Sequence, residues 1–172
     1  GVNERMCRAA GEVADGFHVH PVHSVGYLRD VVKPAIAAGA ASAGRSVDDV
    51  ALYAPVFAVT GETEAARAES EAEVRRQISF YGSTPNYRAV LEYHDCGGIA
   101  KELSALVRQG EFDAMAKLVP DSLMDAVAIS AAPNDLGRAL RQRYDGVLER
   151  VSLYFPIQAA DADASWKRFV SD

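Results

Sequence analysis

Three histidines lie close together near the N-terminus, at His18, His20 and His23. Neighbouring imidazoles can bind a metal ion, and a His-x-His pair on one strand is a recognised ligand geometry. A catalytic zinc site also needs further ligands and a general base, and the one other histidine, His94, falls on a distant predicted helix. Because spacing alone is a weak motif, the pattern favours a polar pocket lined by imidazoles, and we expect no metal there.

The residues around these histidines predict the elements that must position them. Asn3 is a good N-cap for a short amphipathic helix that ends at Val13. Gly16 then allows a tight turn into a strand at Phe17–His20, which Pro21 ends because proline cannot donate to a ladder. Side chains alternate along a strand, so His18 and His20 should share one face. Helix, turn, strand and loop in this order form one unit of an α/β fold.

Two further strands are predicted, at Val50–Val59 and Val147–Phe155. The first is almost continuously apolar, as expected of a strand buried on both faces, although Pro55 should mark a bulge or a sheet edge. Residues 61–146 predict only helices, beginning with the charged segment Glu62–Phe80. Strands separated by helices imply parallel pairing, so we expect about three parallel strands and a long helical insertion.

A second polar group lies inside that insertion, in the run FYGSTPNYR at Phe80–Arg88. Thr84 and Pro85 predict a helix start there, so the run is a junction between two helices. Arg88 offers a planar guanidinium that can bind a carboxylate or a phosphate with two hydrogen bonds. Capping and aromatic packing alone would also account for this junction.

Composition excludes several classes of protein. With 172 residues, 49% hydrophobic and 24% charged, the chain can form one domain with a real core. The net charge of −6 argues against a nucleic-acid partner, and no apolar run is long enough for a membrane span. Two cysteines are too few for a disulfide framework, so we expect a cytoplasmic protein. Because Gly1 has no methionine before it, we also expect a fragment or a processed product.

Several short runs occur along the chain in a fixed order. They are Gly1–Asn3, Ala9–Gly16, Phe80–Arg88, the pair Arg143 and Tyr144, and Val151–Pro156. In these runs the chain resembles the luciferase-like monooxygenases, which use FMN or the deazaflavin coenzyme F420. The resemblance implies a (β/α)₈ TIM barrel, of which residues 1–172 would form only the C-terminal portion, since complete barrels need about 250 residues.

The resemblance also implies roles for particular residues. The backbone at Gly1, Val2 and Asn3 would contact the cofactor, coenzyme F420 or FMN. A small-molecule substrate would be bound by two groups of side chains, namely His18, His20 and His23 in the loop and Tyr81, Ser83 and Arg88 at the helix junction. Catalytic residues are not assigned.

Three functions therefore stay open. The first is a flavin- or F420-dependent oxidoreductase or monooxygenase, or a truncated part of one. The second is a metal-dependent hydrolase that uses His18, His20 and His23. The third is a non-catalytic half-barrel. In each case three strands cannot close a barrel, so we expect a homo-oligomer or pairing with a missing N-terminal half.

Overall fold

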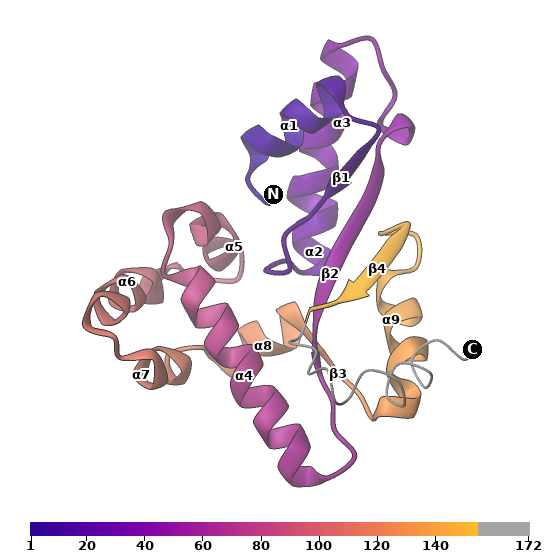
Figure 1. The fold of residues 1–172 in the computed structure, drawn as a ribbon. Helices are drawn as coiled ribbons and strands as arrows, with labels where there is room; N and C mark the ends of the chain where they lie inside the picture. Colours follow the sequence, from indigo (N-terminus) through magenta and orange to yellow (C-terminus); the bar gives the residue numbers. More distant parts are fainter. Residues whose placement is uncertain (155–172) are drawn as a thin grey trace.

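The computed structural model describes residues 1–154 and arranges helices around a parallel sheet (Figure 1). The described strands are β1 at Gly16–His18, β2 at Ala51–Val59, β3 at Ala128–Ser130 and β4 at Arg150–Leu153. All the pairings between them are parallel, which confirms the predicted α/β class. The sequence predicted three of these strands, and β3 is additional. Phe155, the last residue of the third predicted strand, lies outside the described residues.

Strand β2 is the centre of the sheet, since each of the other strands pairs with it. Its first three residues pair with β1, Tyr53–Val56 pair with β4, and its last three pair with β3. Pro55 falls after Tyr53, the last residue paired with β1, and before Phe57, the first paired with β3. Pro55 is also paired with Ser152 of β4, so this proline lies inside the sheet, on its central strand, and not at a sheet edge.

The N-terminal helices pack closely beside β1 (Figure 1). Helix α1 spans Glu4–Val13, and the side chain of Asn3 caps it as predicted. The next helix is continuous but changes pitch: α2 at Val25–Tyr27 leads through a π-helical segment, Leu28–Val32, into α3 at Lys33–Ser42. This irregularity directly precedes Pro34, which lacks the N–H that a regular α-helix would use.

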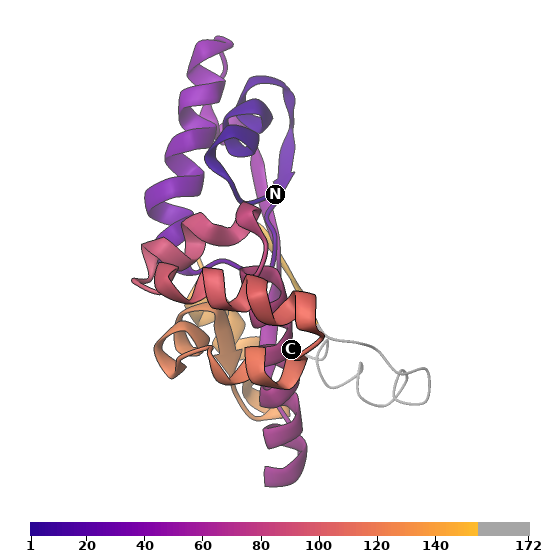
Figure 2. The same cartoon turned by 90° about the vertical axis from the view of Figure 1, so that its left-hand side faces the viewer.

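The segment between β2 and β4 contains most of the remaining helices. They are α4 at Glu64–Gly82, α5 at Arg88–Tyr93, α6 at Ala100–Gln109, α7 at Phe112–Lys117, α8 at Asp121–Val127 and α9 at Leu136–Tyr144. Helices α5, α6 and α7 gather along one side of the long α4, whereas α8 and α9 lie nearer the sheet (Figures 1 and 2). Helix α8 stops at Val127, where the chain becomes extended and forms β3, so the predicted helical insertion at residues 61–146 is interrupted by a strand.

The core lies where β2 meets the helices that cover it. Val56 and Phe57 of β2 are fully buried, together with Ile36 of α3 and Ile78 of α4. None of the helices in residues 1–154 could cross a lipid bilayer, because none is both long enough and apolar enough.

Candidate functional site

Residues 1–3 lie beside β1 and are held by its backbone. The amino group of Gly1 donates to the carbonyl oxygen of His18 at 2.8 Å, and the His20 N–H donates to the carbonyl oxygen of Gly1 at 2.9 Å. Val2 is buried, and its carbonyl oxygen accepts from the Tyr27 hydroxyl at 3.1 Å. The side chain of Asn3 accepts from the Met6 N–H at 3.0 Å. This segment can therefore meet a ligand only through its remaining backbone groups.

His20 follows β1 and is the histidine that best fits a binding role. Its Nδ1 accepts from the N–H of Val22 at 3.2 Å, so the neutral ring carries its proton on Nε2. The imidazole centroid lies 4.4 Å from the ring centroid of Tyr81 and 4.4 Å from that of Tyr87. The structure thus brings the loop after β1 against the helix junction, as the proposed substrate site required.

A fourth ring completes this group. The hydroxyl of Tyr154, one residue beyond β4, lies 2.6 Å from the hydroxyl of Tyr81 in the last turn of α4. The Tyr154 ring packs edge-on against Phe57 of β2, with centroids 5.2 Å apart. We call His20, Tyr81, Tyr87 and Tyr154 the aromatic cluster. All four side chains are partly exposed.

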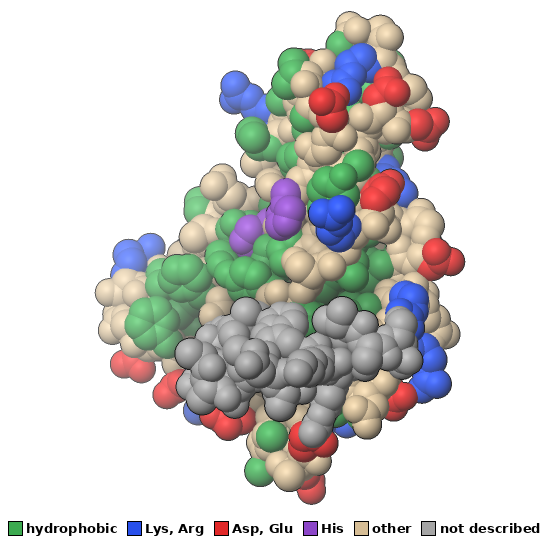
Figure 3. Space-filling model, turned by 45° about the vertical axis from the view of Figure 1, so that its right-hand side comes forward, with side chains coloured by type: hydrophobic (Ala, Val, Ile, Leu, Met, Phe, Trp, Pro, Cys, Tyr) green, Lys and Arg blue, Asp and Glu red, His purple; other side chains and the backbone are tan. Residues whose placement is uncertain are grey.

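The aromatic cluster lies at the carboxyl ends of β1 and β4. His20 comes two residues after β1 ends, and Tyr154 directly follows β4. Figure 3 shows histidine side chains at the surface next to a broad area of hydrophobic side chains on this face. Parallel α/β folds position their binding sites at this end of the sheet, because the loops that follow the strands converge there.

Burial controls the protonation of the cluster. Desolvation, together with the nearby positive groups of Gly1 and His23, lowers the pKa of His20 to about 4. Desolvation raises the pKa of Tyr81 to about 12, with the hydrogen bond to Tyr154 adding to the effect. At neutral pH the site therefore presents a neutral imidazole and protonated phenols.

His23 lies behind the cluster instead of facing solvent, which corrects the expectation that it lines an accessible pocket. Its side chain is fully buried, and its Nδ1 lies 2.8 Å from the carbonyl oxygen of His20. The ring packs edge-on against Tyr144 at 5.8 Å. Both His23 Nε2 and the Tyr144 hydroxyl are buried without a hydrogen-bond partner among the described residues. His23 supports the loop and has no exposed surface for direct substrate contact.

Three other residues expected at the site are directed elsewhere. His18 is exposed on β1. The Ser83 hydroxyl is buried and donates to the carbonyl oxygen of Phe80 at 2.6 Å. Arg88 is exposed and forms an ion pair with Glu92 at 2.8 Å. Their direct role in substrate binding stays a prediction, and the geometry offers each of them another role.

The part of the chain that the structure describes contains no set of metal ligands that would support a metal-dependent hydrolase. Within residues 1–154, no three histidine, cysteine, aspartate or glutamate side chains are close enough to hold an ion together. His20 and His23 each use Nδ1 in a backbone hydrogen bond.

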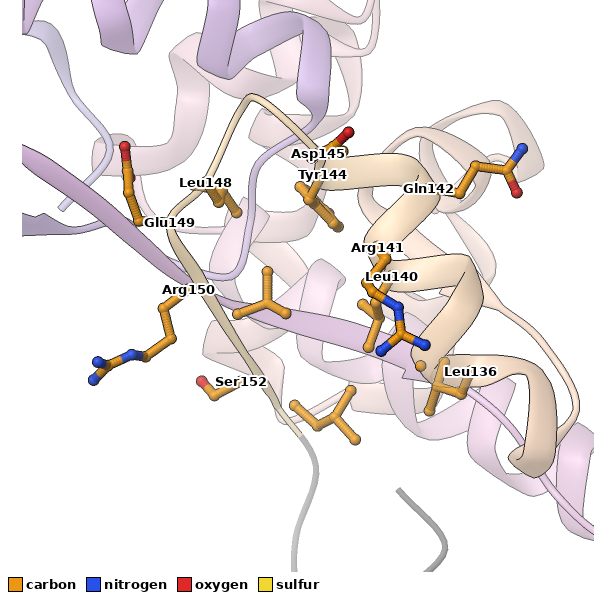
Figure 4. A pocket seen from close by; sticks show the side chains of 13 residues that line it. Leu136, Leu140, Arg141, Gln142, Tyr144, Asp145, Leu148, Glu149, Arg150 and Ser152 are labelled. Carbon is orange, nitrogen blue, oxygen red and sulfur yellow. The ribbon is translucent and has the colours of Figure 1, made fainter. Parts of the chain in front are cut away.

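A groove of about 820 Å³ lies between α9 and β4 (Figure 4). Leu136 and Leu140 of α9 and Leu153 of β4 line it, and so do Arg141 and Arg150. Its position beside β4 is that of the next element of a parallel sheet. We therefore interpret it as a packing surface and not as the substrate site.

Comparison with known proteins identifies the family. Residues 1–150 match the family model described as luciferase-like monooxygenase. The chain belongs to the luciferase-like monooxygenase family. Among its relatives is an uncharacterised protein of Mycobacterium tuberculosis, 41% identical over 150 residues. A 5,10-methylenetetrahydromethanopterin reductase of Methanolobus tindarius is 35% identical over 153 residues.

A solved structure shows the same fold. The coenzyme F420-dependent tetrahydromethanopterin reductase of Methanopyrus kandleri superposes with a TM-score of 0.72 at 21% identity, covering 98% of this chain. The chain spans less than half of these luciferase-like relatives, 44% of each of the two sequences and 46% of the solved chain. The partial TIM barrel inferred from the sequence is therefore confirmed as a fold.

Proposed function

We propose that this chain is part of an F420-dependent oxidoreductase that reduces a small molecule, and that the aromatic cluster contacts the substrate. The observation that carries the proposal is the gathering of His20, Tyr81, Tyr87 and Tyr154 at the carboxyl ends of the strands. The 35% identity to a 5,10-methylenetetrahydromethanopterin reductase supports the choice of F420 over FMN. The free thiols Cys7 and Cys96 agree with a cytoplasmic location.

The residues present fit a flat ring system. Aromatic side chains pack favourably against the faces and edges of planar rings, and four such side chains are partly exposed here. Bound F420 would supply a hydride in a two-electron reduction. The chain's own part would be to orient the substrate with His20 Nε2–H and to exclude water with the tyrosine rings.

The cofactor contacts proposed for Gly1, Val2 and Asn3 would be made by the backbone. The Asn3 side chain already caps α1, and Glu4 in the first helical turn disfavours a phosphate. We therefore assign this segment a peripheral contact. The groups that hold most of the cofactor would come from a complementary half-barrel.

Equilibrium titration of the full chain with F420 and with FMN, followed by fluorescence, tests the cofactor. We expect F420 to bind and FMN to bind at least about tenfold more weakly, which is 1.4 kcal/mol. His20→Ala should weaken binding or turnover, whereas Tyr93→Phe, which removes only a hydroxyl bonded to Asp30, should leave both unchanged. Binding of neither cofactor would contradict the proposal.

A further inference from the structure

The hydroxyl groups of Tyr81 and Tyr154 form a bonded pair, 2.6 Å apart and 73 positions apart in sequence. Each phenol carries one proton and can also accept a hydrogen bond. Only one of the two protons is used between the oxygens. The other proton is therefore available to a third group, and among residues 1–154 the pair has no further hydrogen-bonding partner for it.

The pair also lies where a substrate would meet it. Both side chains are partly exposed, and the Tyr81 ring is 4.4 Å from the imidazole of His20. Phe57 packs edge-on against Tyr154, and Tyr87 packs against Tyr81 with centroids 5.3 Å apart. These neighbours fix both phenol rings, so that the hydroxyls are held at the carboxyl ends of the strands.

We propose that the Tyr81–Tyr154 hydroxyl pair donates the proton that the substrate takes up when it is reduced. This inference rests on the proposed function. A two-electron hydride donor provides a hydrogen and an electron pair, which form a new C–H bond on the substrate. As this bond forms, a bond between that carbon and the neighbouring nitrogen or oxygen breaks, and its electron pair passes to the nitrogen or oxygen. That atom takes the phenol proton, so the substrate gains two hydrogens and the donor is oxidised. The resulting phenolate accepts a hydrogen bond from the second tyrosine and regains its proton from water.

The imidazole of the cluster is less suited to this step. The low pKa of His20 keeps its imidazole neutral at pH 7, so it can orient a substrate but holds no extra proton to give. Burial and the hydrogen bond raise the pKa of Tyr81 to about 12, so that phenol is fully protonated at the same pH. General acids contribute roughly 10²- to 10⁴-fold to turnover, which sets the size of the expected loss.

The test compares Tyr81→Phe, Tyr154→Phe and the double variant, made in the full chain, with Tyr93→Phe as the matched control. The probe is reduced F420 with 5,10-methylenetetrahydromethanopterin. Each single variant should lose about 10²-fold in kcat with little change in KM, and the double variant should lose no more, because the two hydroxyls act as one unit. The solvent deuterium isotope effect on kcat should also change.

Two readouts separate this role from a structural one. F420 binding, followed by fluorescence, should be unchanged in every variant, and the ultraviolet titration of tyrosinate in the unliganded chain should show a lower pKa for Tyr81 in Tyr154→Phe, because the hydrogen bond to Tyr154 adds to the rise that burial causes. Single variants that keep full kcat, or losses that add in the double variant, would overturn the inference while the proposed function stands. A wild-type chain that neither binds F420 nor turns over the probe would overturn both.

Discussion

The Nδ1 atom of His23 lies 2.8 Å from the carbonyl oxygen of His20, three residues earlier, and this contact closes the loop that follows β1. His20 in turn accepts from the N–H of Val22 through its own Nδ1. Both imidazoles thus bond to the backbone of this loop, one of them buried and the other partly exposed. Since His20 packs against Tyr81, the buried histidine supports the position of the aromatic cluster.

Replacement of His23 should therefore destabilise the protein. We expect His23→Ala to lower the free energy of unfolding by about 2 to 4 kcal/mol, because it removes a hydrogen bond and leaves a cavity in the core. Urea denaturation measures the change. His18→Ala is the matched control, since that imidazole is exposed, and its effect should stay within about 0.5 kcal/mol. Equal losses in both variants would contradict the supporting role.

Stability should also fall in mild acid. Burial lowers the pKa of both His20 and His23 to about 4 in the folded chain, from about 6.5 when unfolded. Between these values the unfolded state binds more protons, so the free energy of unfolding decreases as the pH drops from about 6.5 towards 4. Each such histidine contributes at most about 1.4 kcal/mol per pH unit. Urea titrations at several pH values should show a smaller slope in His23→Gln, and an unchanged slope would be contrary evidence.

The local sequence signals were sufficient for the elements of the N-terminal unit. The Asn3 cap and the strand before Pro21 both depend on neighbouring residues and both are confirmed, although the strand predicted at Phe17–His20 ends at His18. Strand β3 was not predictable in this way. It is three residues long and follows α8 with no glycine or proline between them, so only its pairing with β2 makes it a strand.

The close packing of α1 on α3 gives a prediction about glycine. A Cβ atom at Gly39 would overlap the carbonyl oxygen of Arg8, whereas one at Gly137 in α9 would meet nothing within 4 Å. Gly39→Ala should cost about 1 to 3 kcal/mol through overpacking, although alanine favours a helix. Gly137→Ala should instead stabilise by about 0.5 to 1 kcal/mol. Thermal unfolding of the two variants measures both, and a neutral Gly39→Ala would mean that the helices separate at little cost.

The candidate site was harder to predict than the fold, for two physical reasons. First, the type of a polar residue does not reveal its partner. Ser83 bonds to Phe80 and Arg88 to Glu92, each about one helical turn away, and not to a ligand. The spacing of four residues between Arg88 and Glu92 is typical of an ion pair on one helix face, so the sequence alone indicates this contact. The contact of Tyr81 with Tyr154 spans 73 residues, so it depends on how α4 returns to the sheet and no local pattern contains it.

The outer edge of β4 gives the last prediction. Within residues 1–154, β4 pairs only with β2, and the groove beside it exposes Leu148, Val151 and Leu153. Unpaired strand edges with apolar neighbours favour association, and each Å² of apolar surface buried contributes roughly 25 cal/mol. We therefore expect the purified chain to form a homo-oligomer, or to pair with a complementary half-barrel, and light scattering should give at least twice the mass of one chain.

A charge placed on that edge should oppose association. Ser152 is an exposed residue of β4, and Ser152→Lys should reduce the oligomeric fraction, because lysine on an edge strand discourages pairing. Ser42→Lys, at an exposed position in the last turn of α3, is the matched control and should leave the mass unchanged. A wild-type monomer that melts cooperatively at micromolar concentration would show that the edge of β4 is already covered, and that the half-barrel is stable by itself.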